Sequence, residues 1–184
     1  MFKIKGTKLL GKFLSGIMAA TIIVCSVTTT AFASGTPGAG NEPDDEGAII
    51  SHNEVWVTPL EYVETTIYDL GDGFTATVTN TTEYGVSRAS GTKTDTQEIE
   101  IKDGKTLAAT VKVTGTFSFD GSKATVTSAS QTRSVKSGYK ETGWGTGKSN
   151  STTLSSAYVS ATLTVSGNNT EITKTAKVTC GKNG

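Results

Sequence analysis

The amino-acid sequence predicts an all-β protein: an antiparallel β-sandwich of two sheets with about seven to eight strands, rich in hairpins and Ig-like in general architecture. Three observations support this prediction. After position 33, Val outnumbers Leu 12 to 5, and 29 Thr and 16 Ser occur among 151 residues, a composition that favours strands over helices. From Ile49 onward the apolar residues recur at every second position, which is the period of a half-buried strand. No segment has the apolar spacing of an amphipathic helix.

Residues 1–33 have the pattern of a secretory signal peptide. Four lysines precede position 13, a mostly apolar stretch follows, and Ala31 and Ala33 flank Phe32. We expect cleavage between Ala33 and Ser34 and a secreted, extracellular protein. A membrane anchor would need about 20 apolar residues, and this run is shorter and interrupted. Cys25 lacks the small preceding residue of a lipoprotein cysteine, and the chain ends without a sorting motif, so we expect neither a lipid anchor nor a covalent wall anchor.

The rest of the chain divides into a spacer and one domain. Residues 34–48 contain Gly, Pro and acidic residues without an apolar pattern, so we expect a disordered spacer, followed by a single β-sandwich domain at 49–184. After position 33 the chain has 13 basic and 17 acidic residues, and this negative net charge argues against a nucleic-acid partner. Cys180 has no internal disulfide partner there, so it is either a buried apolar residue or paired with another chain.

Turn-forming residues divide the domain into runs of alternating apolar and polar residues. The predicted strands are 54–58, 60–70, 74–87, 94–101, 105–119, 123–135, 157–165 and 170–179. Between Leu107 and Phe119 the apolar residues share one parity and the Thr and Lys residues the other, so we expect one buried and one wet face. Trp56 and Phe117 are predicted core residues.

The turns predict the strand register, because both strands of a hairpin must place their apolar residues on the same face. A three-residue loop near position 103 would place Ile99 opposite Leu107. A two-residue turn at 121–122 would place Phe117 opposite Val126.

The C-terminal half of the chain carries a resemblance. Thr114–Ser130 contains a Phe-Ser-Phe-Asp-Gly-Ser turn, and it is followed by a Ser-rich polar segment and an alternating strand pair from Ala157 to Thr179. This arrangement resembles small secreted all-β proteins of unknown function from Gram-positive bacteria. The lysine-rich signal resembles the signals of the same bacteria. The resemblance implies no activity and no site residues.

Few residues are suited to catalysis or metal binding. Residues 143–149 end in Gly-Lys-Ser like a phosphate-binding loop, but Thr142 stands where that motif requires glycine, and no helix is predicted to follow. His52 is the only histidine, and the acidic residues stand mainly at strand and turn positions expected to face solvent. We therefore expect no enzyme activity, no nucleotide or other cofactor, and no metal site.

Residues 136–150 depart from the strand pattern, and we expect a long loop there. Tyr139 and Trp144 stand among Gly and Lys residues, and aromatic rings provide the flat apolar area that binds sugars or partner proteins. We predict ligand binding by Tyr139, Lys140, Trp144 and Lys148. The alternative is that Trp144 folds back onto the end of the sandwich and covers the core.

The sequence favours a secreted, non-enzymatic binding module of adhesion type for an extracellular glycan, cell-wall polymer or protein. One alternative is a membrane-active or pore-forming protein, because strands such as 155–165 alternate Thr or Ser with small apolar residues, as convertible hairpins do. Membrane contact is expected only under this alternative. A second alternative is a small extracellular hydrolase, which would need two carboxyl groups about 5 to 9.5 Å apart in an open cleft.

Overall fold

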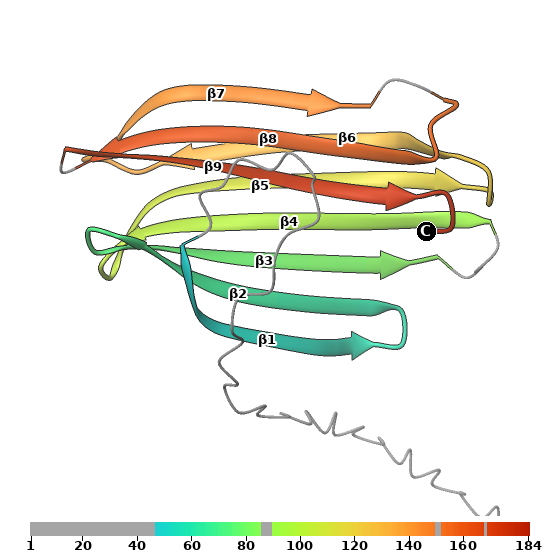
Figure 1. Ribbon diagram of the computed structural model, residues 1–184, viewed down its shortest axis with the longest axis horizontal. Helices are drawn as coiled ribbons and strands as arrows, with labels where there is room; N and C mark the ends of the chain where they lie inside the picture. Colours follow the sequence, from blue (N-terminus) through green and yellow to red (C-terminus); the bar gives the residue numbers. More distant parts are fainter. Residues whose placement is uncertain (1–46, 86–89, 150–151, 168) are drawn as a thin grey trace, which may run out of the picture.

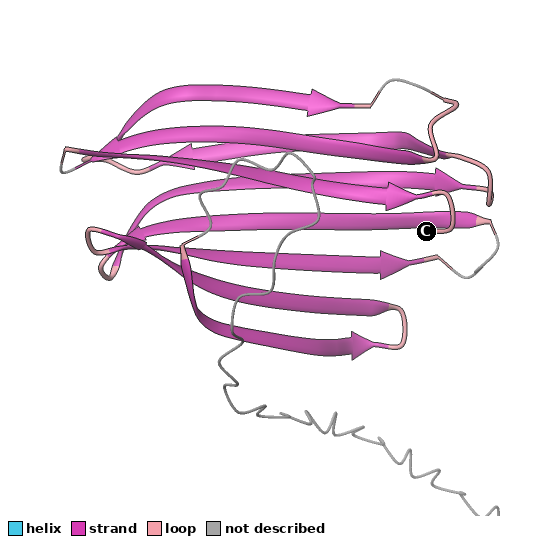
Figure 2. Cartoon of the chain, viewed as in Figure 1, coloured by secondary structure: helices cyan, strands magenta, loops and turns pink. Residues whose placement is uncertain are grey.

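Nine antiparallel strands in two sheets form the domain (Figure 1). The structure is a computed structural model that describes residues 47–85, 90–149, 152–167 and 169–184. Every regular element within these ranges is a strand (Figure 2), and none of them contains a helix long and apolar enough to cross a membrane. The predicted signal peptide, its cleavage site and nearly all of the predicted spacer lie outside the described residues. The prediction of an all-β protein with two antiparallel sheets is confirmed.

Within each sheet, every strand pairs with its neighbour in the sequence, so both sheets are built from successive hairpins. The larger sheet consists of β1 (Ala48–Thr58), β2 (Glu61–Gly71), β3 (Phe74–Tyr84), β4 (Gly91–Asp103), β5 (Thr106–Phe119) and β6 (Ala124–Val135). The smaller sheet consists of β7 (Lys140–Lys148), β8 (Ser156–Gly167) and β9 (Thr170–Gly181).

The smaller sheet covers only part of the larger one. Strands β8 and β9 pack on β5, β9 also contacts β4, and β7 and β8 contact β6. Among the described residues, β1 and β2 make no comparable contact with the smaller sheet. In Figure 1 they lie at the bottom of the view, farthest from β7. The core therefore lies mainly between β4–β6 and β7–β9, with Phe74 and Ala76 of β3 at its margin.

Strand β5 shows why the core forms there. From Ala109 to Phe119 every second residue is buried, and the residues between them are partly or fully exposed. Across the sandwich, β8 contributes a matching buried row from Ala157 to Val165. The predicted buried face of β5 and the predicted burial of Phe117 are confirmed. Cys180 is also buried and free.

The prediction that Trp56 is a core residue is wrong, because Trp56 is 60% exposed. It lies on β1, the edge strand of the larger sheet, and the three strands of the smaller sheet do not extend over it. Alternation along a strand indicates which residues share a face. It does not indicate whether a second sheet covers that face.

The predicted long loop at 136–150 contains the strand β7 instead, so the sandwich has nine strands rather than seven or eight. Gly143, Gly145 and Gly147 alternate with larger side chains along this strand. A Cβ atom at Gly147 would come within 2.8 Å of the Ser160 hydroxyl oxygen on β8. Glycine therefore fits at Gly147, where the backbone of β7 lies close to a side chain of the neighbouring strand. The high glycine content of residues 136–150 is nevertheless typical of a loop.

The two predicted registers have different outcomes. Phe117 pairs with Val126, as predicted. Ile99 pairs with Val111, so the prediction that it lies opposite Leu107 is wrong. The turn between β4 and β5 begins two residues later than predicted, and a β-bulge near it returns the apolar side chains of both strands to the same face.

Replacing Phe117 by Ala should destabilise the domain much more than replacing Thr116. Phe117 is fully buried, whereas Thr116 is only partly buried on the opposite face of β5. Removal of a buried Phe ring costs on the order of 3 to 5 kcal/mol, out of a total stability of roughly 5 to 15 kcal/mol for a domain of this kind. Denaturant unfolding should therefore show a large fall in midpoint for Phe117→Ala and little change for Thr116→Ala. Equally small changes would contradict this strand placement.

Candidate functional site

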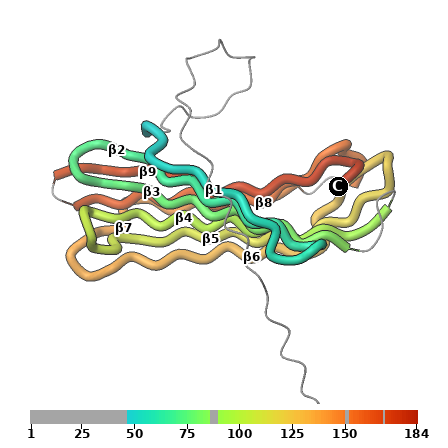
Figure 3. The backbone as a smooth tube through the Cα atoms, turned by 90° about the horizontal axis from the view of Figure 1, so that it is seen from below, coloured from blue at the N-terminus to red at the C-terminus, as the bar shows by residue number. Residues whose placement is uncertain are grey.

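The inner face of the larger sheet is uncovered where it extends beyond the smaller sheet, and we call this surface the open face. In Figure 3, which views the molecule from below, β1 and β2 lie nearest the viewer. Directly opposed residues of paired strands point to the same side of a sheet, so the strand register defines the members of this surface. They include His52, Glu54 and Trp56 on β1, Tyr62, Glu64 and Thr66 on β2, and Val78, Asn80, Thr82 and Tyr84 on β3. Lys93, Asp95 and Gln97 on β4 continue this face at its border with β9.

Three aromatic residues from the first three strands meet on the open face, with Trp56 in contact with both Tyr62 and Tyr84, and we call these three residues the aromatic row. The ring centroid of Trp56 lies 5.2 Å from that of Tyr62 and 6.4 Å from that of Tyr84. The register places Trp56 directly opposite Tyr62, which brings the first two rings together. Trp56 and Tyr84 are 60% and 42% exposed, so the row presents flat apolar area to solvent.

A ladder of polar side chains runs beside this aromatic row. The Asn80 side-chain amide donates to the Glu64 carboxylate at 3.4 Å, and the Gln97 side-chain amide donates to the Asn80 side-chain oxygen Oδ1 at 2.7 Å. The Gln97 carbonyl oxygen in turn accepts a hydrogen bond from the backbone N–H of Lys177 at 2.8 Å. Lys177 lies on β9, so the ladder connects the open face to the edge of the smaller sheet.

A cleft of about 280 Å³ follows the ladder between the larger sheet and β9. Its lining includes Tyr62, Glu64, Asn80, Asp95, Gln97 and Lys177. The cleft therefore joins an aromatic ring to amide and carboxylate groups, a combination suited to a ligand with both apolar and hydrogen-bonding groups.

Asp95, which lines the cleft, forms a charged pair with Lys93. The Lys93 ammonium is 3.0 Å from the Asp95 carboxylate and 5.9 Å from the centre of the Tyr84 ring. Asp95 is only 7% exposed, and its Oδ1 atom has no hydrogen-bond partner among the described residues. Burial raises the pKa of Asp95, and the hydrogen bond and charge of Lys93 oppose this shift.

A histidine and two glutamates gather at the β1 end of the ladder, on the same side of the aromatic row. His52 Nε2 lies 3.0 Å from Glu54 Oε1, and His52 Nδ1 lies 3.7 Å from Glu64 Oε1. One nitrogen or oxygen atom from each of the three residues lies within 4.8 Å of the corresponding atoms of the other two. Hydrogen bonds with His52 and Tyr62 hold the pKa of Glu54 below its ordinary value. These donors are of the types that bind a divalent metal ion.

The four residues that the sequence analysis selected for ligand binding do not lie on the open face. Tyr139 precedes β7 and donates a hydrogen bond to the Asp103 carboxylate at 3.1 Å. Trp144 is partly buried against the core, and the Arg133 guanidinium lies 4.3 Å from the centre of its ring. This position agrees with the alternative that Trp144 covers the core. The binding role of Trp144 and Tyr139 stays a prediction.

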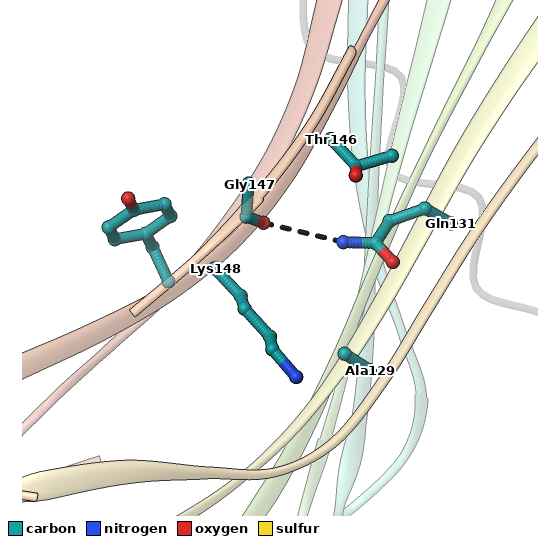
Figure 4. Close-up of a pocket in the computed structure, with 6 residues that line it drawn as sticks. Ala129, Gln131, Thr146, Gly147 and Lys148 are labelled. Atoms are coloured by element: carbon teal, nitrogen blue, oxygen red, sulfur yellow. Dashed lines mark hydrogen bonds between the residues drawn. The ribbon is translucent and has the colours of Figure 1, made fainter. Parts of the chain in front are cut away.

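The two lysines of that set also lie along β7. Lys140 is exposed at the start of the strand, and Lys148 is exposed at its end. Lys148 lines a separate cavity of about 440 Å³ between β6 and β7 (Figure 4). In this cavity the Gln131 amide donates to the backbone carbonyl of Gly147 at 3.3 Å. The structure thus distributes the four residues along one margin of the sandwich and does not gather them around one cleft.

Sequence reasoning missed the open face because it placed Trp56 in the core. A signal for this surface is nevertheless present in the sequence. His52, Glu54 and Trp56 share one parity on β1, and Tyr62 and Glu64 share one parity on β2. A strand face that mixes aromatic and charged residues is more typical of a binding surface than of a core.

No protein-family model matches the chain, and no curated protein or solved structure matches it either. The function is therefore inferred from the residues of the open face.

Tyr62 should make the stability of the domain depend on pH in the alkaline range. Burial raises the pKa of its hydroxyl from 10.0 to about 12, and the hydrogen bond to Glu54 adds to this shift. The folded protein thus keeps the phenolic proton to a higher pH than the unfolded chain does. The stability contributed by this group is present below about pH 10 and is lost as the pH rises towards about 12.

Urea unfolding of the protein and of Tyr62→Phe measures this effect. The difference between their free energies of unfolding should fall between pH 10 and pH 12, and it should fall less when both proteins also carry Glu54→Gln. A difference that stays constant over this range would show that the pKa of Tyr62 is not raised.

Proposed function

We propose that the protein is a secreted, non-enzymatic binding module, Ig-like in general architecture and similar to small secreted proteins of Gram-positive bacteria, that binds an extracellular glycan on its open face. The observation that supports this proposal is the exposed aromatic row beside the Glu64, Asn80 and Gln97 ladder. Polysaccharides of a cell wall belong to the same chemical class.

The chemistry of a sugar ring matches both parts of this surface. A pyranose has an apolar face of C–H groups, which can lie flat on an aromatic ring, and a rim of hydroxyl groups. Asn80 and Gln97 each use only one amide N–H in the ladder, so each keeps a second donor for a hydroxyl oxygen. The Glu64 carboxylate keeps acceptor capacity for a hydroxyl proton.

The dimensions of the apolar area favour a glycan over a protein partner. A stable protein interface buries about 800 Å² on each partner and has an apolar centre depleted of charged residues. On the open face, Glu54, Glu64 and Asn80 lie at the register positions next to Trp56 and Tyr62, so charged and amide groups begin directly beside the three rings. A chain of sugar rings fits this narrow arrangement.

Trp56→Ala should weaken glycan binding at least tenfold, which corresponds to about 1.4 kcal/mol. The ring is exposed, so its removal should leave the fold intact while it removes the centre of the row. Binding can be measured by calorimetry with a panel of soluble β-glucans, chitin oligosaccharides, mannans and peptidoglycan fragments. Tyr84→Ala should weaken binding to the same member of the panel.

Two control variants test where the ligand binds. Tyr158→Ala removes an exposed tyrosine from β8, outside the open face, and should leave binding unchanged. Trp144→Ala tests the ligand-binding residues selected from the sequence and should also leave the affinity of the folded protein unchanged. If Trp144→Ala abolishes binding and Trp56→Ala does not, the site lies along β7. If the folded protein binds no member of the panel, the glycan proposal is wrong.

A further inference from the structure

We propose that His52, Glu54 and Glu64 form a binding site for a divalent transition-metal ion, with Zn²⁺ as the best match. This inference does not depend on glycan binding. It rests on the positions of the three side chains, on the hydrogen bonds that hold them from outside the group, and on the charge that the strand register brings together.

The backbone places the three residues on one face at the centre of the β1 and β2 pair. Glu54 lies directly opposite Glu64, and His52 lies opposite Thr66. The side chains of His52, Glu54 and Glu64 are 43%, 55% and 33% exposed, so an ion can reach them from solvent. Two ligand atoms of a tetrahedral Zn²⁺ site lie roughly 3.3 Å apart, given bonds of about 2.0 to 2.1 Å. The 3.0 Å separation of His52 Nε2 and Glu54 Oε1 is close to that spacing.

Each of the three side chains also has a hydrogen-bond partner outside the group. The hydroxyl of Thr66, a buried residue, lies 2.9 Å from His52 Nδ1 and can accept a hydrogen bond from Nδ1–H, which leaves Nε2 available to a metal ion. Glu64 Oε1 lies 3.7 Å from Nδ1, so the Glu64 side chain must turn towards Nε2 to share the ion. The Asn80 amide donates to Glu64 Oε2 at 3.4 Å, and Tyr62 hydrogen-bonds to Glu54. Such outer partners fix the tautomer and orientation of metal ligands.

The charge of the group gives a second reason for a cation. Glu54 and Glu64 are like charges directly opposed on paired strands, an arrangement that destabilises a sheet. Asn80 and Tyr62 are neutral donors and supply no positive charge. A bound divalent cation would neutralise both carboxylates.

The donor types select the class of ion. One imidazole nitrogen and two carboxylate oxygens suit Zn²⁺ and similar transition metals, whereas Mg²⁺ prefers six oxygen ligands at octahedral positions. Three protein ligands leave a fourth tetrahedral position for water or for a ligand atom.

The test is calorimetric titration of Zn²⁺ into the chelator-treated full chain, carrying no histidine tag. We expect one equivalent of Zn²⁺ to bind and the melting temperature to rise with Zn²⁺ concentration, because an ion that binds only the folded state stabilises it. His52→Ala and Glu64→Gln should each weaken binding at least tenfold. Co²⁺ in place of Zn²⁺ should give the visible absorption of a four-coordinate site.

The matched control is Glu61→Gln, which removes a carboxylate from the opposite face of β2 and should bind Zn²⁺ like the unchanged protein. Circular dichroism confirms that each variant is folded. The proposal is overturned if the unchanged protein shows neither heat of binding nor a shift in melting temperature. It is also overturned if folded His52→Ala and Glu64→Gln bind Zn²⁺ with unchanged affinity, since the ion would then be held elsewhere.

Discussion

A sheet of three strands cannot cover a sheet of six, and the rest of the structure depends on this mismatch. The core forms where both layers are present, between β4–β6 and β7–β9. Beyond β4 the larger sheet continues through β1–β3 by backbone pairing, with progressively less packing from the smaller sheet. Backbone hydrogen bonding extends a sheet in its own plane, whereas burial requires a second layer. Strands β1 and β2 are therefore held mainly by pairing, and their inner side chains are available for contacts with other molecules.

The two margins of the sandwich show how an opposing strand decides the role of an aromatic residue. At the β6 and β7 margin both sheets have a strand, and Arg133 on β6 covers the ring of Trp144 while it pairs with Glu141 at 2.7 Å. Trp144 is consequently only partly exposed. At the β1 margin, β1 makes no comparable contact with the smaller sheet among the described residues, and Trp56, which contacts Tyr62 and Tyr84, is 60% exposed. The same residue type thus closes one margin and forms a surface at the other.

The sequence predicted correctly those features that depend on residues close together in the chain. Alternation in β5 predicted its buried face, and the two-residue turn at 121–122 predicted the pairing of Phe117 with Val126. Prediction failed where the outcome depends on a distant partner. The burial of Trp56 depends on how far the smaller sheet extends, and the glycines at 143 and 147 of β7 lie against the side chains of Thr164 and Ser160 on β8. The gathering of His52 with Glu64 required the register between β1 and β2, which no turn signal in the sequence had fixed.

The Glu64 side chain belongs to a chain of hydrogen bonds that joins the open face to the smaller sheet. It lies between Glu54 on one side and Asn80 on the other, and through Asn80 and Gln97 it is joined to the backbone N–H of Lys177. The ladder therefore ends on a backbone group of β9, whose inner face packs in the core. A surface that is held in this way loses little conformational freedom when a ligand binds, which favours affinity. The uncovered part of the larger sheet thus has exposed side chains, and the amide side chains of Asn80 and Gln97 join it by hydrogen bonds to β9 of the smaller sheet.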